Sequence, residues 1–278
     1  MSKLNYLNVG CGNKFHKEWI NVDMVSNSPH VKAYNLLKGI PLSNDQFDVI
    51  YHSQVLEHFP KEKALDFIRE CFRILKPGGT MRVVVPDLEN IVSEYIKHLN
   101  ENIKNPSKQA EANYDWILLE MYDQTVRNYG GGQMAEFLKQ PDLVNEKYII
   151  DRIGYVGKNI RNNFLEKKDS KQGISNLMKI VKKIGIKKVS KYIIKKITNI
   201  FSSKAQKIGS FRLGGEIHMW MYDRSSLSRL LREVGFEDIE VKTPHESNIP
   251  QWNKYELDVK DGAVFDPTSL FMEARKPR

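Results

Sequence analysis

Two glycines and an acidic residue stand at the ends of the first two apolar runs of the chain. Residues 4–9 lead into Gly10, Cys11 and Gly12, and residues 20–23 end in Asp23. A strand that stops in a Gly-x-Gly turn lets a small molecule approach the bare backbone. An acidic residue at the tip of the next strand can accept hydrogen bonds from a ribose diol. This spacing indicates a nucleoside-bearing cofactor at the carboxyl ends of parallel strands.

The same segment argues against a dinucleotide cofactor. The fingerprint for NAD or FAD needs a third glycine three positions after Gly12, where this chain has Phe15. Asp23 follows Gly10 by thirteen residues, which is too short for a strand, a full helix and a turn. A cofactor with a ribose and an adenine but no phosphates fits better, and S-adenosylmethionine is the candidate.

The elements that must position these residues alternate along the first third of the chain. One helix is predicted over 61–75, where apolar residues recur at helical spacing before Pro77 and Gly78. Strands are predicted over 4–9, 20–23, 31–35, 48–53 and 80–85. Such an order implies a parallel sheet with ligand loops at the carboxyl ends of its strands.

The pattern changes after about residue 90. Residues 90–212 are predicted to be mostly helical, and strand-and-helix order then returns. A helix is expected over 222–234, with Ser225 or Ser226 near its start and Gly235 at its end, before strands at 237–242 and 269–276. We therefore expect one α/β domain from 1–89 and 213–278, with a helical insertion over 90–212.

Composition places the chain among ordinary globular proteins. It has 278 residues, 41% of them hydrophobic, which suits one elaborated domain or a domain with an insert. No apolar stretch approaches the ~20 residues needed to cross a bilayer, and we expect no signal peptide. Only Cys11 and Cys71 occur, which favours a reduced, cytoplasmic compartment.

Five short motifs follow one another at compatible spacings. They are Leu-Asn-Val-Gly-Cys-Gly (7–12), Asn-Val-Asp (21–23), Phe-Asp-Val-Ile-Tyr (47–51), Leu-Glu-His (56–58) and Leu-Lys-Pro-Gly-Gly (75–79). Together they resemble a class I S-adenosylmethionine-dependent methyltransferase of the type 11 group. Residues 116–127 and 218–223 are more loosely similar to a subgroup of predicted methyltransferases associated with bacterial surface-polysaccharide synthesis. The resemblance implies a three-layer αβα sandwich with a mostly parallel, seven-stranded sheet and a helical insertion after the fifth strand.

The resemblance also implies roles for individual residues. Asp23 would hold the ribose hydroxyls, and Cys11 would line the site rather than act as a nucleophile. The other expected cofactor contacts are Gly10 and Gly12 at the methionine moiety, Asn35 and Leu36 at the adenine, and His52 and Ser53 at the methyl donor. The family usually has an acid where this chain has Asn8, whose amide can organise the loop but brings no charge for the ammonium group.

A hydroxyl acceptor would need a proton acceptor near it. The candidates are His218, Asp123 and His52, while His58 is interpreted as a structural cap and no metal is expected. Glu120, Asp123 and Arg127 share one helical face, which is either a solvated ion-pair stripe or a hydroxyl-binding surface. Aromatic residues nearby favour a sugar, and the glycines that follow suggest the hinge of a lid. These are Trp116, Tyr122 and Tyr129, then Gly130, Gly131 and Gly132.

One segment carries most of the positive charge. Residues 166–207 hold thirteen lysines against Glu166 and Asp169, in a chain whose net charge is +9. Apolar residues at helical spacing make this a basic amphipathic pair of helices, which favours an anionic bilayer surface. The alternative is that the apolar stripe packs on the domain. Nucleic acid is disfavoured because the segment has no arginine and few aromatic residues.

The sequence thus predicts a cytoplasmic enzyme that uses S-adenosylmethionine to methylate a sugar oxygen. The acceptor would be a surface glycan or a lipid-linked saccharide, met at the inner face of the membrane. Two alternatives stay open. The enzyme could methylate another small molecule or a lipid, or the chain could be a cofactor-binding scaffold without catalysis. The sequence leaves the oligomeric state undetermined.

Overall fold

The centre of the molecule is a seven-stranded sheet with the order β3-β2-β1-β4-β5-β9-β6. The computed structural model describes residues 4–36, 39–169 and 202–278. The strands are β1 (Tyr6–Val9), β2 (Ile20–Asp23), β3 (Val31–Ala33), β4 (Phe47–Ser53), β5 (Leu75–Pro86), β6 (Glu237–Lys242) and β9 (Ser269–Arg275). Only β9 runs antiparallel to its neighbours, β5 and β6. The mostly parallel, seven-stranded sheet predicted from the sequence is confirmed.

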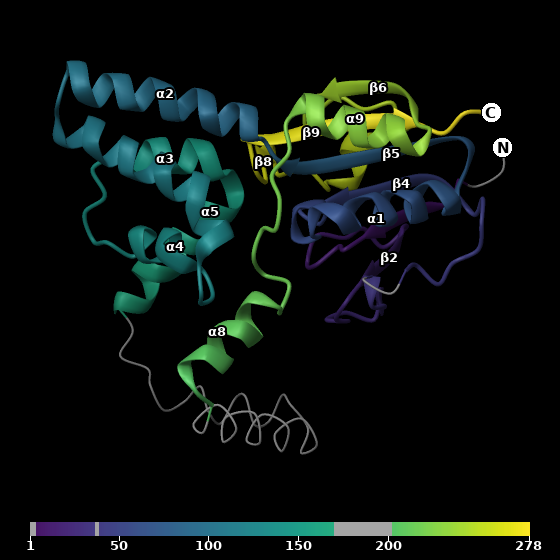
Figure 1. Ribbon diagram of the computed structural model, residues 1–278, viewed down its shortest axis with the longest axis horizontal. Helices are drawn as coiled ribbons and strands as arrows, with labels where there is room; N and C mark the ends of the chain where they lie inside the picture. The colour runs from purple at the N-terminus through teal and green to yellow at the C-terminus, as the bar shows by residue number, and fades with distance from the viewer. Residues whose placement is uncertain (1–3, 37–38, 170–201) are drawn as a thin grey trace.

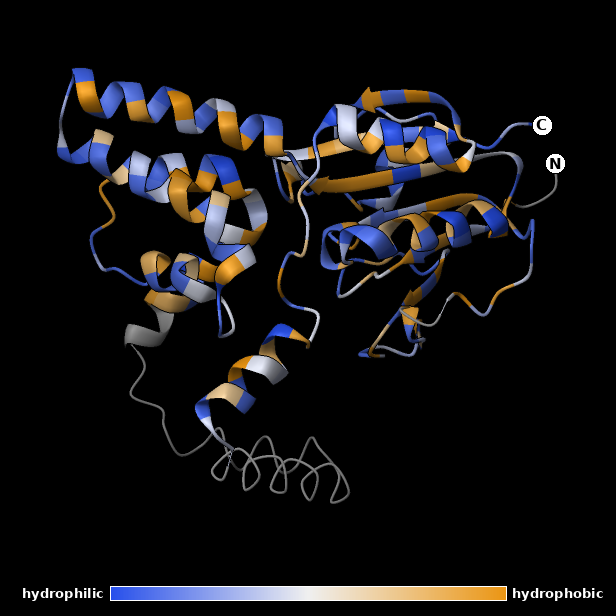
Figure 2. Cartoon of the chain, viewed as in Figure 1, coloured by the Kyte–Doolittle hydropathy of each residue, from blue (hydrophilic) through white to orange (hydrophobic). Residues whose placement is uncertain are grey.

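One face of the sheet is covered by the helices α1 (Lys61–Ile74) and α9 (Arg224–Val234) (Figure 1). Both helices alternate apolar and polar residues along their length (Figure 2). In α1 the buried positions include Phe67, Ile68 and Cys71, which pack on Ile50 and Met81 of the sheet. The sequence predicted this amphipathic spacing. It lets α1, which connects β4 to β5 along the chain, pack its apolar side on the sheet.

The opposite face is covered differently. The connections 10–19 and 24–30 contain no helix, so they cannot supply a helical layer there. An aromatic cluster covers this face instead, in which Trp19 and Tyr51 meet Trp252 and Tyr255 of the 3-10 helix η3 (Trp252–Tyr255). The sandwich therefore has helices on one face and a 3-10 helix with extended chain on the other.

The predicted helical stretch leaves the sheet at the end of β5. Its helices are α2 (Leu88–Lys104), α3 (Lys108–Val126), α4 (Gly132–Leu138), α5 (Glu146–Asp169) and α8 (Lys204–Arg212). They gather at the end toward which β5 points, and the chain returns between the two halves of the molecule (Figure 1). Exit and return lie side by side, because Asp87 pairs with Tyr222 and the amide of Leu88 donates to the carbonyl of Tyr222 at 2.8 Å.

The stretch is also docked on the body at its far side. The helix α5 kinks at Gly154, which has φ 53° and ψ −140°. A Cβ on Gly154 would lie 2.5 Å from Pro267 and 2.6 Å from the carbonyl oxygen of Val264, so glycine permits this close approach. Val264 belongs to β8 (Ala263–Val264), which pairs with β7 (Val259–Lys260) in a small hairpin.

Two local predictions can be compared with the structure. Ser225 and Ser226 lie in the first turn of α9 as expected, and the N-cap residue is Asp223, with which Ser226 completes a capping box. Gly131 is the N-cap of α4, and the carboxylate of Asp123 accepts from the amide of Gln133 at 2.7 Å, while the hinge of a lid stays a prediction. The lysine-rich prediction falls mainly on 170–201, which lie outside the described residues. Among the described helices, none is long and apolar enough to span a bilayer.

Candidate active site

The carboxyl ends of β1 and β2 form one tied turn. The amides of Gly10 and Cys11 donate to the carbonyl of Val22 at 2.8 and 3.2 Å. The amide of Gly12 donates to Oδ2 of Asp23 at 2.8 Å. Asp23 is partly buried, and its other oxygen accepts from the amide of Val25 at 3.2 Å. The turn and the acidic tip that the sequence singled out therefore lie next to each other.

The two glycines have different reasons for lacking a side chain. Both have positive φ, 66° at Gly10 and 52° at Gly12. A Cβ on Gly10 would lie 2.4 Å from Cγ2 of Val55, so that position is closed by packing. A Cβ on Gly12 would meet nothing within 4 Å, so its backbone faces open space. A small molecule can approach the chain at Gly12, as a nucleoside cofactor requires.

The geometry of this turn does not suit a pyrophosphate. A dinucleotide site uses the N-terminus of a helix that follows the glycine turn. Here residues 10–19 run from β1 to β2 without a helix, and Phe15 of this segment contacts His30. The residues present therefore fit a ribose held by Asp23 beside bare backbone, which matches S-adenosylmethionine.

Lys14 is a polar neighbour of the glycine turn that the sequence analysis missed. Its Nζ donates to Oγ of Ser53 at 3.1 Å, and its backbone carbonyl accepts from the side-chain Nδ2 of Asn8 at 2.9 Å. The amide of Asn8 thus organises the loop, as expected. Burial lowers the pKa of Lys14, against the attraction of Asp258 and Asp266. A lysine two residues after the Gly-x-Gly turn was the available signal.

The other residues expected around the cofactor have mixed surroundings. Asn35 is exposed at the end of β3, whereas Leu36 is buried in the main core. Cys11 is buried, and burial raises the pKa of its thiol to about 12. A thiol that stays protonated at neutral pH is a poor nucleophile, which agrees with a packing role. The roles assigned to Asn35, Leu36 and Ser53 stay predictions.

His52 lies in the core rather than in the exposed loops at the carboxyl ends of the strands. Its ring is fully buried, packs edge-on against Phe67 with centroids 5.1 Å apart, and has no hydrogen-bond partner among the described residues. Burial lowers its pKa to about 3. A neutral imidazole shielded by α1 is better explained as part of the packing than as a base that reaches an acceptor.

The charged stripe of α3 is used inside the protein. Glu120 accepts a 2.7 Å bond from Nε of Arg152, and Trp116, fully buried, donates to the same carboxylate at 2.5 Å. Asp123 caps α4, and Nη2 of Arg127 donates to the carbonyl of Glu216 at 3.0 Å. These contacts fit neither the solvated stripe nor the sugar surface expected from the sequence, and both oxygens of Asp123 already accept bonds from backbone amides of α4.

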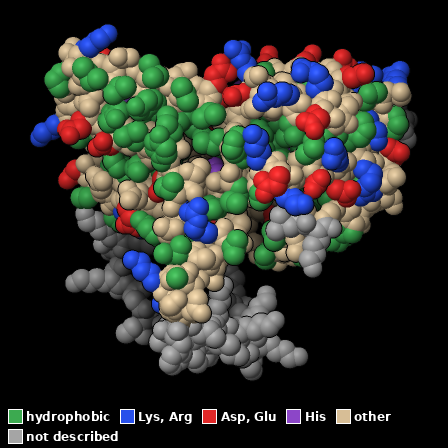
Figure 3. Space-filling view, in the orientation of Figure 1, with side chains coloured by type: hydrophobic (Ala, Val, Ile, Leu, Met, Phe, Trp, Pro, Cys, Tyr) green, Lys and Arg blue, Asp and Glu red, His purple; other side chains and the backbone are tan. Residues whose placement is uncertain are grey.

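His218 meets two residues of the Leu-Glu-His motif. This motif forms the 3-10 helix η2 (Leu56–His58) directly after β4. The rings of His218 and His58 lie edge to face with centroids 4.9 Å apart, and Nε2 of His58 lies 4.0 Å from Oε1 of Glu57. Figure 3 shows histidine atoms at the surface between the two halves of the molecule. A buried carboxylate and two imidazoles thus converge where the sheet edge meets the returning chain.

Burial controls the charge of this cluster. It raises the pKa of Glu57 to about 8 and lowers that of His218 to about 3, and it also lowers the pKa of His58. Both imidazoles are therefore neutral at physiological pH, and Glu57 can exchange a proton there. Glu57 was missed by the sequence analysis, although an acid in the loop after β4 was a visible signal.

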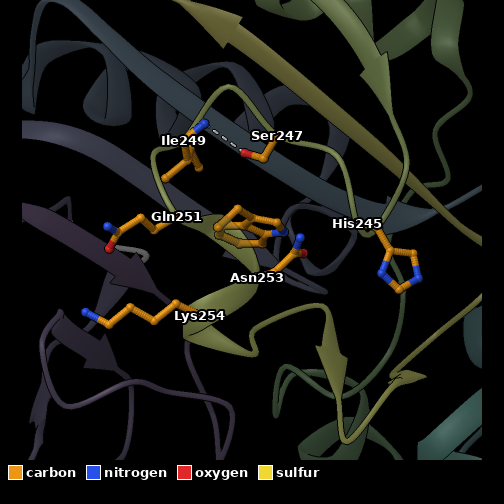
Figure 4. A pocket seen from close by; sticks show the side chains of 7 residues that line it. His245, Ser247, Ile249, Gln251, Asn253 and Lys254 are labelled. Carbon is orange, nitrogen blue, oxygen red and sulfur yellow. Dashed lines mark hydrogen bonds between the residues drawn. The ribbon is translucent and has the colours of Figure 1, made fainter.

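Two open pockets lie elsewhere on the surface. One, of about 540 Å³, is lined by residues of the segment 245–254, including His245, Gln251 and Lys254 (Figure 4). This segment packs through Trp252 on the face of the sheet that carries Trp19, and the glycine turn contributes nothing to the pocket. The other, of about 350 Å³, lies between α3 and α4 and includes Tyr129, Gln133 and Phe137.

Comparison with known proteins supports the cofactor assignment. Residues 24–83 match the family described as a methyltransferase domain. A Mycolicibacterium smegmatis protein described as a probable S-adenosylmethionine-dependent methyltransferase is 39% identical over 51 residues, which cover 18% of this chain and 19% of the relative. The match therefore spans about a fifth of the curated relative. The family match and the description of this relative agree with S-adenosylmethionine, the cofactor expected from the sequence.

Solved methyltransferase structures match the chain at low sequence identity. A SAM-dependent methyltransferase from Archaeoglobus fulgidus is 11% identical, with 98% of this chain and 86% of that chain covered and a TM-score of 0.38. One from Thermotoga maritima is also 11% identical, with 99% and 84% covered and a TM-score of 0.38. The sheet order described above defines a Rossmann-like α/β methyltransferase fold. These two structures say nothing about the acceptor.

Proposed function

We propose that this chain is an S-adenosylmethionine-dependent methyltransferase that methylates a hydroxyl group of a sugar, in a surface glycan or a lipid-linked saccharide. The observation that carries the proposal is the position of Glu57, His58 and His218. They converge directly after β4, at the carboxyl ends of the parallel strands, where the glycine turn and Asp23 also lie. In this proposal the turn that holds the cofactor follows β1 and the proton acceptors follow β4, and these two strands are parallel neighbours.

The chemistry assigns a separate task to each group. The cofactor supplies an electrophilic methyl group when it is bound. Asp23 holds the ribose and the turn at Gly12 leaves room for it, while Lys14 beside Ser53 provides a cation that suits the carboxylate of a methionine moiety. The acceptor hydroxyl must lose its proton as its oxygen is methylated, and the neutral ring of His218 or the fraction of Glu57 that is ionised near its pKa of about 8 would take it. Burial of the cluster keeps competing water away.

The preference for a sugar comes from the surface between α3 and α4. Tyr129 and Phe137 line the pocket there together with the amides of Gln133 and Gln140. Aromatic faces beside a few polar groups suit a ring with several hydroxyls. The backbone amide of Gly131 donates to Glu216, two residues from His218, which joins this surface to the proton-accepting cluster.

The test has two stages. Calorimetry of the full chain with S-adenosylmethionine and with its demethylated product should show binding of both. Isotopically labelled donor should then label lipid-linked saccharides from a cell extract, on oxygen. His218→Asn should reduce the rate strongly while His245→Asn, an exposed control, leaves it unchanged. Binding without transfer would support the scaffold, and label on a lipid or a nitrogen would contradict the sugar assignment.

A further inference from the structure

The side chains of Glu57, His58 and His218 form a compact cluster of potential metal ligands. One donor atom from each lies within 4.8 Å of the others. All three are held by short elements, Glu57 and His58 by η2 and His218 by the segment that returns from α8. Such a cluster could bind an ion between its three side chains, which is a different property from accepting a proton.

The carboxylate of Glu57 provides an independent observation. Its side chain is fully buried, and neither oxygen has a hydrogen-bond partner among the described residues. A buried carboxyl group without a hydrogen-bond partner is costly, and such groups in proteins are normally hydrogen-bonded, ion-paired or bound to a metal ion. Lys14 attracts Glu57 but gives its hydrogen bond to Ser53. The carboxylate of Glu57 therefore has room for a binding partner that the described side chains do not supply.

The imidazole of His58 is oriented as in a metal site. Its Nδ1 lies 3.0 Å from the carbonyl oxygen of Ile217. A carbonyl can only accept, so Nδ1 carries the proton and the lone pair is on Nε2, the nitrogen that faces Glu57. Metal-bound histidines commonly donate their other nitrogen to a backbone carbonyl in this way.

The backbone holds His218 against the same element. The amides of Met219 and Trp220 donate to the carbonyl of Glu57 at 2.7 and 3.2 Å. The amide of His218 itself donates to the carbonyl of Gln124 at 2.9 Å. The cluster is thus fixed on both sides by main-chain bonds that do not use the three side chains.

We propose that Glu57, His58 and His218 bind one divalent transition-metal ion, and that zinc is the ion their donor set favours. Two imidazoles and one carboxylate are the ligands of open zinc sites, in which a fourth position takes water or substrate. Ligand atoms at about 2.0–2.2 Å from a tetrahedral metal lie about 3.4 Å apart. Small side-chain rotations within the present cluster would reach that spacing.

Metal binding here does not depend on the proposed methyl transfer. An oxygen bound at the open position would lose its proton more readily, which would serve O-methylation if that is the reaction. The ion itself can be detected without any acceptor or cofactor.

The experiment uses the full chain after removal of metals with EDTA. Addition of Co²⁺ should give visible absorption bands that saturate at one ion per chain, and Zn²⁺ should displace it and raise the melting temperature. Mg²⁺, which prefers oxygen ligands, should do neither. Glu57→Gln and His218→Ala should each weaken Zn²⁺ binding by about 100-fold or more, whereas His245→Ala should not.

The same variants distinguish metal binding by these three residues from a purely structural role. Glu57→Gln keeps the shape of the side chain and removes the carboxylate that would bind the metal, so the metal-free variant should fold and bind S-adenosylmethionine like the wild type. The proposal is overturned if the wild type takes up no Co²⁺ or Zn²⁺ at micromolar concentration. It is equally overturned if the folded Glu57→Gln and His218→Ala variants bind zinc as the wild type does. If the wild type binds zinc but transfers no methyl group, that result would count against the proposed function alone.

Discussion

Asp23 and Gly12 are joined by a hydrogen bond of 2.8 Å, from the amide of the glycine to Oδ2 of the carboxylate. This bond ties the ends of β1 and β2 and leaves other lone pairs of the carboxylate for a ribose. Asp23→Ala should therefore lose both the tie and the ribose contact. Cofactor affinity should fall by about 1.5–3 kcal/mol, or roughly 10- to 150-fold, as measured by calorimetry.

Two variants sharpen this prediction. Asp23→Asn keeps one accepting oxygen and should give an intermediate loss. Asp66→Ala removes an exposed carboxylate on α1 and should leave the affinity unchanged. Wild-type affinity in Asp23→Ala would exclude the ribose role.

Alanine at the two glycines should separate stability from binding. Gly10→Ala places a methyl group 2.4 Å from Cγ2 of Val55 in addition to the strain of positive φ, so it should destabilise the fold by about 1–3 kcal/mol. Gly12→Ala meets open space and should cost only about 1 kcal/mol of stability while it blocks the cofactor. Urea unfolding and calorimetry measure the two effects. Val55→Ala combined with Gly10→Ala should recover part of the loss, and no recovery would contradict the clash.

His52 should make the protein sensitive to acid. Its pKa is about 3 in the folded protein and 6.5 without burial, so the unfolded chain binds the proton first as the pH falls. The stability contributed by the neutral ring is therefore present above pH 6.5 and is lost as the pH falls toward 3. By pH 5 the loss is about 2 kcal/mol, and His52→Leu should lack it.

The measurement is urea unfolding of both proteins at pH 8 and pH 5. The gap between wild type and His52→Leu should change by about 2 kcal/mol between the two pH values. The exposed His245→Leu serves as the control and should show no such change. A gap independent of pH would mean that His52 is charged or solvated in the folded state.

The pair of Glu120 and Arg152 should be strongly coupled. Both side chains are buried, with Nε of Arg152 2.7 Å from Oε1 of Glu120, and Trp116 bonds the same carboxylate. Arg152→Met strands a buried charge and should destabilise by about 3–5 kcal/mol. Glu120→Leu with Arg152→Met should be less destabilising than the sum of the single changes. The exposed pair Glu136 and Lys139 should give under about 1 kcal/mol, and equal effects from both pairs would contradict the role of burial.

The lysine-rich segment gives a prediction that depends on the sequence alone. We propose that residues 166–207 contact an anionic bilayer, to which each lysine near the surface contributes about 1 kcal/mol. The full chain should sediment with vesicles that contain phosphatidylglycerol at low salt, and less with phosphatidylcholine. Replacement of the lysines in 170–201 by glutamine should abolish sedimentation and leave cofactor affinity intact. Failure of the wild type to sediment would end the membrane proposal.

The sheet and the cofactor edge were predictable because they depend on local patterns. Short apolar runs that end in glycine or aspartate define β1 and β2, and Gly235 ends α9 as expected. The connections 10–19 and 24–30 contain no helix, so the second face is covered by η3 instead. That replacement depends on contacts between Trp19 and Trp252, which are far apart in the sequence.

The proton-accepting cluster could be predicted only in part. His218 was selected from its position before α9, but its neighbours Glu57 and His58 come from a motif about 160 residues earlier. Asp123 shows the opposite case, since a polar residue on a helical face looked available and is used as a cap for α4. Spacing along one helix does not reveal which polar groups the rest of the fold consumes.

The pairing of Asp87 with Tyr222 brings together the two ends of the helical stretch that lies between them in the sequence. All seven strands of the sheet lie outside that excursion, so a longer, shorter or unrelated stretch could join the same two residues while Gly12 and Asp23 keep their own hydrogen bond. Such a graft would, however, also replace His218. Exchange of the helical stretch and loss of one member of the Glu57 cluster would thus occur in a single step.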